Sequence, residues 1–500
     1  MQWEARQHSA ACQLIALVTS GMLFNSIGFV VFFSTVTALY FTLPWGARWK
    51  ALLLASCVFY MSFIPIYILI LGVTIAIDYS MALMIEPAVG ARRKMYLWIS
   101  IVATCIVLFI FKYYNFFVDT ANTLGGVFRF DSIPLLKIVL PLGLSFHTFQ
   151  SLSYVAEVYY GRQRAERNFG IYSLYVMYYP QLVAGPIERP QNLLHQFYED
   201  HRFKVEDVME GLQIMGWGFF KKMVVADRLA VYVNSVYGDW QAHHGLALLI
   251  ATVFFAIQIY ADFSGYSSIA IGCSRVMGIR LMQNFNTPYF AASVTEFWRR
   301  WHISLSTWFK DYVYIPLGGN RKGEARAYLN LLVAFLVSGI WHGANWTFVV
   351  WGAYNGLLLC AEKGARAAGI RLPPTLRFVG WAGTAICILC GWIFFRAPSV
   401  GDAMGILGRI ATDLRVDFGS VTQAILPMTG DNTALAYMVT ACAFSGLMFL
   451  GEWAYSRDFW GLSTALRQRR ALQIGACVVA VQVVFLFGVL RPSAFIYFQF

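Results

Sequence analysis

Long apolar runs, separated by short polar stretches, follow one another along most of the 500-residue chain. Residues 471–490 read ALQIGACVVAVQVVFLFGVL and contain no charged side chain. Because a helix rises about 1.5 Å per residue, roughly 20 such residues cross a hydrocarbon core of about 30 Å. The pattern predicts an all-helical polytopic membrane protein with roughly ten to thirteen helical segments, some of them too short to cross the bilayer fully. The alternating pattern of a membrane β-barrel is absent from the sequence.

Composition supports this class, since 58% of the residues are hydrophobic and only 13% are charged. Soluble domains are nearer half apolar and a quarter charged. The formal net charge of +12 would suggest a nucleic-acid partner in a soluble protein. In a membrane protein, basic residues in cytoplasmic loops explain it, and no nucleic acid is expected. The nine cysteines are scattered through apolar runs and are interpreted as packing residues.

The domain organisation follows from the two ends of the chain. Residues 1–21 contain an acid and lead to no clear cleavage site, so they do not resemble a cleaved signal peptide. We interpret them as a candidate N-terminal extension. Residues 22–490 are predicted to form a single membrane domain, and residues 491–500 an aromatic C-terminal motif.

Charge asymmetry predicts the orientation of the chain in the membrane. Basic clusters at 92–94, 363–377 and 457–470 are expected in the cytoplasm. Segment 398–433 balances two arginines with four aspartates and is expected outside. The last span therefore runs outward and brings Tyr497 near the extracytoplasmic face.

The first polar cluster in an apolar context is residues 293–323. On one continuous helix, its apolar and polar side chains segregate to opposite faces. The apolar face holds Phe297, Trp298, Trp301, Leu305, Trp308 and Phe309, and the polar face holds Thr295, Arg299, His302, Ser306 and Lys310. The helix could lie at the membrane interface, which periodicity alone favours, or line a wet cavity with His302 inside.

The run PLGGNRKG that follows predicts a tight turn. Its Arg321 and Lys322 could bind phosphate groups or simply lie in a solvated cytoplasmic loop, which is the favoured alternative.

The second cluster is SGIWHGANWTFVVWGAYNG, residues 338–356, in which His342 lies between apolar runs. A histidine at this depth can be neutral and accept a proton, which suits a general base acting on a hydroxyl that attacks a thioester. A structural histidine bonded to a carbonyl is the equal alternative. The glycines either allow close helix packing or break a helix.

The third cluster is residues 258–272, where Asp262, Ser264, Tyr266 and Ser267 crowd an apolar stretch. Asp262 could orient a histidine or bind a substrate hydroxyl, or it could belong to a polar packing knot around Gly265. A similar segment carries Lys221, Lys222, Asp227 and Arg228. Those charges could pair with one another or cap a span at the surface, and the surface option is favoured.

The sequence lacks the motifs that mark several other kinds of site. There is no His-Glu-x-x-His motif, Walker loop, dinucleotide fingerprint or complete nucleophile elbow. We therefore expect neither a metal site nor a tightly bound cofactor.

The first two clusters, TEFWRRWHISLSTWFKDYVYIPLGGNRKG and SGIWHGANWTFVVWGAYNG, resemble the membrane-bound O-acyltransferase superfamily. The resemblance is to its bacterial branch, typified by the alginate O-acetyltransferase membrane subunit. LPLGLSFHTFQSLSYVAEVYYG, YYPQLVAGPIERP, GFFKKMVVADRLA and ADFSGYSSIAIG match in the same order, so the resemblance runs from about residue 22 to 397. Two departures are His147, where tyrosine is usual, and Glu157, where aspartate is common.

The resemblance implies a fold of about eleven transmembrane helices, plus re-entrant or interfacial helices, around a central tunnel. In this fold His342 is the catalytic histidine and His302 is the second core histidine. The resemblance thereby favours the cavity for His302. It also implies an acyl donor in the cytoplasm, usually acetyl-coenzyme A, and delivery of the acyl group outward. Candidate donor-binding or supporting residues are Asp227, Asp262, Ser264, Tyr266, Asp311, Asn320, Arg321 and Lys322.

The final residues FIYFQF resemble a terminal motif of bacterial systems of this family, in which the tyrosine is proposed to accept the acyl group. His342 would then deprotonate Tyr497, while Phe495, Phe498 and Phe500 would plug the tunnel. An aromatic residue at the outer interface is the alternative for Tyr497.

The implied partners are an extracytoplasmic SGNH-type acyltransferase, polysaccharide biosynthesis and export machinery, and the bilayer of a bacterial inner membrane. Peptidoglycan or teichoic-acid acylation, and a non-enzymatic transporter or scaffold, stay open as alternatives.

Overall fold

The computed structural model describes residues 22–128, 132–141, 143–183, 185–370, 372–415, 433–458, 469–489 and 495–498. These residues form helices, turns and loops and contain no strand, which confirms the all-helical class. The predicted N-terminal extension lies outside the described residues.

Seven helices in the described part of the chain are long and apolar enough to cross a membrane. They are Tyr67–Ile85, Gly90–Gly125, Gly245–Val276, Glu324–His342, Arg377–Arg396, Leu435–Ser456 and Arg470–Phe487. The protein is therefore a multi-pass membrane protein, while the count of about eleven spans stays a prediction.

The chain divides into two compact units. The first contains residues 1–212, 269–282 and 492–500, and the second contains residues 213–268 and 283–491. The single membrane domain expected over 22–490 stays a prediction, and each unit is described by itself.

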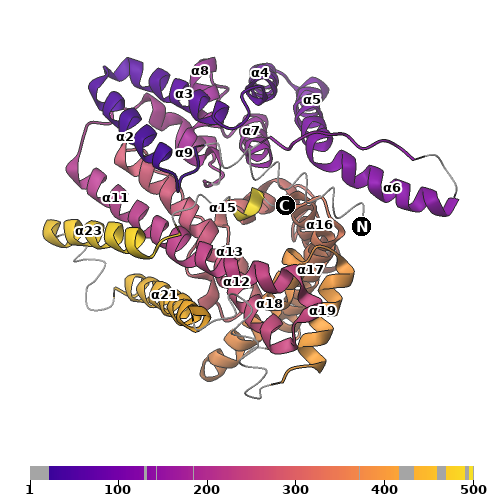
Figure 1. The fold of residues 1–500 in the computed structure, drawn as a ribbon. Helices are drawn as coiled ribbons and strands as arrows, with labels where there is room; N and C mark the ends of the chain where they lie inside the picture. Colours follow the sequence, from indigo (N-terminus) through magenta and orange to yellow (C-terminus); the bar gives the residue numbers. More distant parts are fainter. Residues whose placement is uncertain are drawn as a thin grey trace. The chain divides into compact units, whose positions relative to one another are not determined.

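The first unit is built from helices α2 to α10 and the 3₁₀-helix η2 (Figure 1). Their bounds are α2 Ile27–Thr42, α3 Trp45–Met61, α4 Tyr67–Ile85, α5 Gly90–Leu108, η1 Phe109–Tyr113, α6 Tyr114–Phe128, α7 Leu144–Tyr159, α8 Phe169–Met177, α9 Tyr179–Leu182, α10 Pro190–Leu193 and η2 Leu194–Tyr198. The short η9, Ile496–Phe498, also belongs to this unit. Helices α11 (Val205–Phe219) and α13 (Gly245–Val276) each contribute residues to both units.

A buried carboxylate ties three helices of the first unit together. Asp78 of α4 accepts hydrogen bonds from Ser100 and Thr104 of α5, at 2.6 and 3.1 Å, and from Ser151 of α7. Asp78 is fully buried, so these hydroxyls replace the water that it loses on folding.

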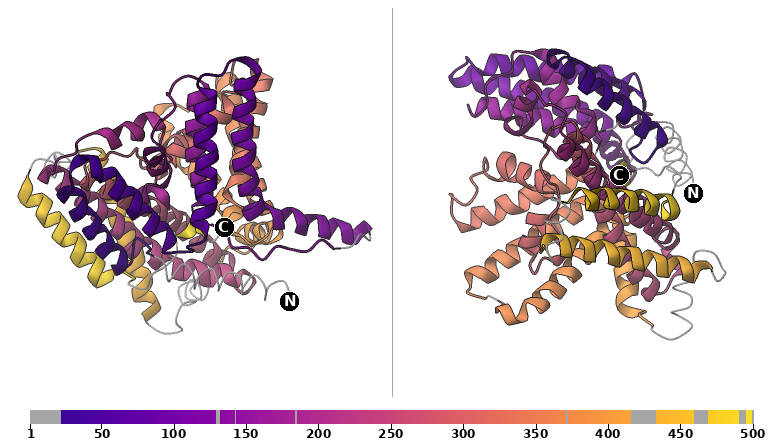
Figure 2. Two further views of the ribbon diagram at one scale, coloured as in Figure 1. Left: turned by 90° about the horizontal axis from the view of Figure 1, so that it is seen from above. Right: turned by 90° about the vertical axis from the view of Figure 1, so that its left-hand side faces the viewer.

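The second unit takes in the later part of α11, η3 (Phe220–Ala226) and α13 as far as residue 268, and it holds most of the later helices. The remaining bounds are α12 Asp227–Gly238, η4 Trp240–Ala242, η5 Pro288–Phe290, α14 Val294–Arg300, α15 Ile303–Phe309, η6 Lys310–Tyr314, α16 Glu324–His342, α17 Trp346–Ala367, η7 Pro374–Leu376, α18 Arg377–Arg396, α19 Val400–Thr412, α21 Thr433–Ser456 and α23 Arg470–Phe487. Helices α21 and α23 lie side by side (Figure 2), with the rings of Phe444 and Phe487 5.1 Å apart.

Helices α16 and α17 pack backbone to backbone. A Cβ added to Gly339 would lie 2.3 Å from the Phe348 carbonyl oxygen, and one added to Gly352 would lie 2.5 Å from that of Phe335. Only glycine leaves room for this approach. The prediction that glycines in segment 338–356 allow close packing is confirmed.

The single helix predicted across 293–323 is wrong, because the chain breaks at His302. Helix α14 ends at Arg300, and α15 begins at Ile303. The Ile303 N–H donates to the Asn284 carbonyl at 2.8 Å, and the Arg300 carbonyl accepts from Asn286 N–H at 2.9 Å. Bonds to this neighbouring segment replace those that a continuous helix would make, and they override the sequence periodicity.

Candidate active site

His302 occupies the break between α14 and α15 with a left-handed backbone, φ 42° and ψ 57°. Few residues other than glycine adopt this conformation, so it requires support from the surroundings. Asn284 supplies that support, because it accepts from Ile303 N–H through its carbonyl and from Ser304 Oγ through Oδ1, at 2.8 and 2.6 Å.

The His302 side chain is only 1% exposed, so its placement at a solvated interface is wrong. Its ring lies 4.5 Å from that of Phe263 and 6.4 Å from those of Phe285 and Trp341. His302 lies between the candidate spans, and burial lowers its pKa to about 3. The imidazole is therefore neutral at physiological pH.

His342 is the last residue of α16 and is 6% exposed. Its ring lies 5.0 Å from those of Trp341 and Trp351 and 5.3 Å from that of Phe395. The chain then turns at Gly343, where a Cβ would come within 2.1 Å of the Phe348 ring. The start of α17 is capped by Asn345, whose Oδ1 accepts from Thr347 N–H at 3.0 Å.

The structure thus brings both candidate histidines to one tryptophan, Trp341. We call His302, His342, Trp341, Phe263, Trp351 and Phe395 the histidine cluster. A desolvated imidazole among rings can take and return a proton where water is excluded, which suits general-base chemistry on a water-sensitive acyl group.

A second buried polar group, the lysine cluster, consists of Lys222, Asp227, Asp262 and Tyr266. Lys222 Nζ lies 2.8 Å from Asp227 Oδ1 and 2.7 Å from Asp262 Oδ1, and it lies over the Tyr266 ring. All four residues are buried. The prediction that the charges of segment 221–228 cap a span at the surface is therefore wrong for Lys221, Lys222 and Asp227, while Arg228 is half-buried.

The helix packing around η3 explains the burial of two consecutive lysines. The neighbour of Lys222, Lys221, pairs with Glu452 of α21 at 3.6 Å, while Lys222 pairs with Asp262 of α13. A Cβ at Gly265 would lie 2.9 Å from the Gly218 carbonyl oxygen, so the helices meet closely there. Of the interpretations given for Asp262, this geometry favours the packing knot. Ser264 is also buried on α13.

The predicted turn after η6 is present, with Gly318 and Gly319 at positive φ of 117° and 53°. Asp311 is half-buried, whereas Asn320, Arg321 and Lys322 are exposed. Asn320 Oδ1 accepts from the Tyr314 hydroxyl at 2.5 Å and from Lys363 Nζ at 3.4 Å. This exposure fits the solvated-loop interpretation of the two cations.

Tyr497 lies in η9 of the first unit, half-buried, with its ring 5.4 Å from that of Phe495. The side chains of Phe498 and Phe500 lie outside the described residues. The expected meeting of Tyr497 with His342 stays a prediction.

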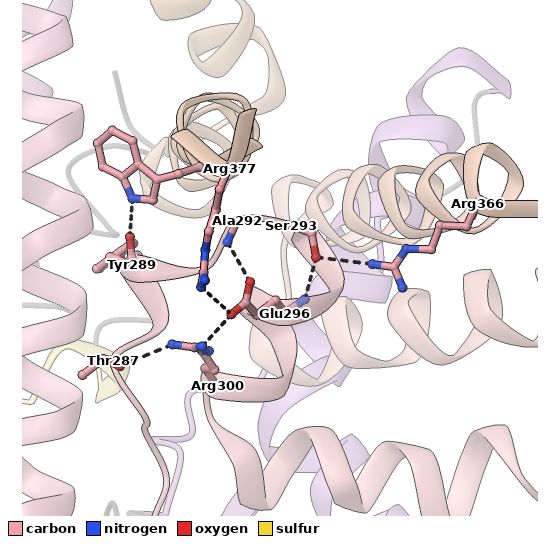
Figure 3. A network of polar contacts seen from close by, with 9 residues as sticks. Thr287, Tyr289, Ala292, Ser293, Glu296, Arg300, Arg366 and Arg377 are labelled. Atoms are coloured by element: carbon pink, nitrogen blue, oxygen red, sulfur yellow. Dashed lines mark hydrogen bonds and ion pairs between the residues drawn. The ribbon is translucent and has the colours of Figure 1, made fainter. Parts of the chain in front are cut away.

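Sequence reasoning missed the network that fixes the start of α14 (Figure 3). Ser293 Oγ accepts from Glu296 N–H at 3.1 Å, and Glu296 Oε2 accepts from Ala292 N–H at 2.8 Å. Glu296 Oε1 also pairs with Arg300 at 2.5 Å. The signal was available, because Ser293 and Glu296 have the spacing of a capping box.

Asn284 was missed as well, because nothing local marks an asparagine that supports a distant helix break. Its contribution appears only when segments 284–286 and 300–304 are seen together.

The helical fold, the candidate spans and the buried histidine cluster define a multi-pass membrane protein with a site suited to acyl transfer. The model of the family described as MBOAT, membrane-bound O-acyltransferase, matches residues 168–399, which include both histidines. The chain belongs to this family and is an acyltransferase.

Curated relatives cover most of the chain. It is 35% identical to the probable alginate O-acetylase of Pseudomonas putida, over 96% of this chain and 100% of the relative. It is 40% identical to the protein of the same name from Pseudomonas aeruginosa, over 76% and 73%. It is also 33% identical to the peptidoglycan O-acetyltransferase of Helicobacter pylori, over 77% and 79%.

Proposed function

We propose that this protein moves an acetyl group from a cytoplasmic thioester, acetyl-coenzyme A, across the membrane for O-acetylation of an extracellular polysaccharide. The observation that carries the proposal is the pair of buried histidines, His302 and His342, packed against Trp341. The names of the relatives, which include alginate O-acetylases and a peptidoglycan O-acetyltransferase, support an acetyl group and a polysaccharide acceptor.

In the proposed reaction, His342 takes the proton of the Tyr497 hydroxyl as the phenol oxygen attacks the thioester carbonyl carbon. The tetrahedral intermediate collapses with cleavage of the carbon–sulfur bond, and His342 returns the proton to the leaving thiolate. The products are free coenzyme A and an acetyl ester on Tyr497. The rings around His342 protect the acyl group from hydrolysis by excluding water.

The acetyl ester of a phenol is an activated donor. An extracytoplasmic acyltransferase of the SGNH type would collect the acetyl group and transfer it to a polysaccharide hydroxyl, which regenerates the Tyr497 phenol. His302, neutral and held by its backbone, would shape the chamber in which His342 works.

Mass spectrometry of the C-terminal peptide after incubation with acetyl-coenzyme A tests this proposal. A mass increase of one acetyl group on Tyr497 is expected in the native protein and not in Tyr497→Phe. Tyr160→Phe, which changes an exposed tyrosine at the end of α7, is the control and should acquire the label normally. Full polymer acetylation in cells that carry Tyr497→Phe would contradict the shuttle.

Peptidoglycan is the second candidate acceptor, because the Helicobacter pylori relative is a peptidoglycan O-acetyltransferase at 33% identity. Deletion of the gene, followed by separate acetate analysis of the sacculus and of the secreted polysaccharide, distinguishes the two. Loss of acetate from the sacculus alone would favour peptidoglycan.

A further inference from the structure

A polar pocket of about 520 Å³ lies within the first unit, where η2, loop 199–204, the start of α11 and the end of α13 meet. Apart from Gly278, every residue that lines it has a polar or charged side chain. Its charged and hydrogen-bonding groups suit a polar, charged ligand better than a fatty acyl chain or a sterol.

Hydrogen bonds hold the walls of the pocket together. The Gln196 side chain donates to the Arg280 carbonyl and accepts from Arg280 N–H, both at 2.8 Å. His201 Nε2 lies 2.8 Å from the Gln196 carbonyl oxygen. Gly278 has a φ of 84°, and a Cβ there would lie 3.1 Å from His201, so the wall closes tightly. The pocket is thus built before any ligand enters.

The carboxylates of the pocket already have cationic partners. Asp207 pairs with Arg275 at 2.8 Å, and Asp200 pairs with Arg48 at 3.1 Å and with Arg202 at 3.3 Å. Glu199 lies 3.5 Å from His195.

Two cationic side chains of the pocket take no part in these ion pairs. Among the residues that the structure describes, Lys204 and Arg280 make no ion pair, and both line the pocket. Arginine and lysine together suit phosphate groups, since the guanidinium binds two oxygens at once and the ammonium acts as a point charge.

The pocket lies at the end of the first unit that the charge pattern assigns to the cytoplasm. Beside it, the Tyr198 hydroxyl donates to Glu166 at 2.7 Å. The next residues link this point to the end of α4, because Ala165 N–H donates to Glu86 at 3.1 Å and Arg167 also pairs with Glu86. The loop after Glu86 leads into the basic cluster at 92–94, which is expected in the cytoplasm.

We propose that this pocket binds the 3′-phospho-ADP end of a coenzyme A thioester, through Lys204 and Arg280. The inference rests on the proposed function for its donor, and it adds the place where the nucleotide of that donor is recognised. Three features of the pocket fit this part of the donor. They are the positive charge of Lys204 and Arg280, the volume with its polar lining, and the location expected on the cytoplasmic side.

The test compares two donors that share a thioester and differ in the nucleotide, acetyl-coenzyme A and acetyl-pantetheine, with the full-length protein in nanodiscs. For Lys204→Gln/Arg280→Gln, we expect KM for acetyl-coenzyme A to rise by about tenfold or more, because two charge-assisted contacts to phosphate are lost. KM for acetyl-pantetheine should not change. The control Arg92→Gln/Lys94→Gln removes the same charge from exposed positions outside the pocket and should leave both values unchanged. An equal rise for both donors, or no rise, would overturn the proposal.

A binding experiment separates this inference from the proposed function. Calorimetric titration with adenosine 3′,5′-bisphosphate should show binding to the wild type and about tenfold weaker binding to the double variant. If no thioester is turned over but this binding pattern is seen, the proposed function fails and the pocket assignment stands. Equal affinity for inorganic phosphate, or loss of nucleotide binding in nanodiscs that contain phosphatidylglycerol, would instead assign the pocket to free phosphate or to a lipid headgroup and overturn the proposal.

Discussion

The histidine cluster and the lysine cluster are both buried polar groups in the second unit, but their surroundings differ. The Lys222 ammonium lies between two carboxylates at 2.7 and 2.8 Å, so its charge is compensated where it lies. His302 and His342 lie among the rings of phenylalanine and tryptophan. Both groups come from segments that match the family.

The difference teaches that burial and family membership do not by themselves separate chemistry from architecture. A buried ion pair among helices fixes their packing and is costly to break. A neutral imidazole in an apolar chamber remains able to change its protonation during a reaction. We therefore expect substitutions in the histidine cluster to affect turnover, and substitutions in the lysine cluster to affect folding.

The largest expected effect is on turnover in His342→Ala. Loss of the general base should lower the rate of acetyl transfer by about 10²–10⁴-fold, while the thermal stability of the detergent-solubilised protein changes little. Initial rates with acetyl-coenzyme A and a melting curve measure the two quantities. Normal turnover in this variant would remove His342 from the mechanism.

The next effect is on stability in Lys222→Met. The substitution leaves Asp227 and Asp262 buried without their cation and should destabilise the protein by about 3–5 kcal/mol. Denaturation in mixed micelles measures it. The triple variant Lys222→Met/Asp227→Asn/Asp262→Asn removes all three charges and should recover much of the loss. If the single variant is as stable as the wild type, the lysine cluster does not hold the helices together.

A smaller effect is expected where α16 and α17 touch, on the same two helices that carry His342 and Trp351. Gly339→Ala places a methyl group 2.3 Å from the Phe348 carbonyl oxygen and should cost about 1–3 kcal/mol by overpacking, with a parallel loss of turnover. Gly383→Ala is the matched control in α18, since a Cβ there meets no atom within 4 Å. Equal melting temperatures for the two variants would contradict the close packing.

The smallest effect concerns the network at the start of α14. Glu296→Ala removes the acceptor for Ala292 N–H and the partner of Arg300, and should cost about 1 kcal/mol. Turnover should fall only slightly, because α14 ends two residues before His302 and is also anchored by Asn286. Glu296→Gln keeps the capping acceptor and should be closer to the wild type in its melting temperature. A loss in Glu296→Ala as large as that in Lys222→Met would mean that the network does more than cap the helix.

Sequence patterns predicted what depends on local order along the chain. The uncharged run at 471–490 predicted a span, and the structure has α23 at Arg470–Phe487. The glycines at 339 and 352 predicted close packing, because a residue without a side chain lets the backbone of a neighbouring helix approach. The two histidines were singled out by their apolar flanks and by the resemblance.

Long-range contacts decided the rest. Lys222 is buried because Asp262 lies on another helix, and no local pattern reveals that partner. His302 ends a helix because Asn284 and Asn286 capture backbone groups around it, although the apolar spacing of Phe297, Trp301 and Leu305 continues unbroken. The basic residues that line the polar pocket lie in two segments, one near residue 200 and one near residue 280, so the sequence shows two ordinary loops.

The left-handed backbone of His302 has a consequence for any attempt to raise the thermal stability of this protein. Asparagine would relax that backbone by about 1 kcal/mol and still fill part of the buried space, whereas glycine would leave a cavity, so selection for heat resistance alone should enrich His302→Asn. Such a variant would lose the second imidazole and gain a less strained backbone. A survey of thermostable mutants would thereby locate a functional residue of the enzyme without a kinetic assay.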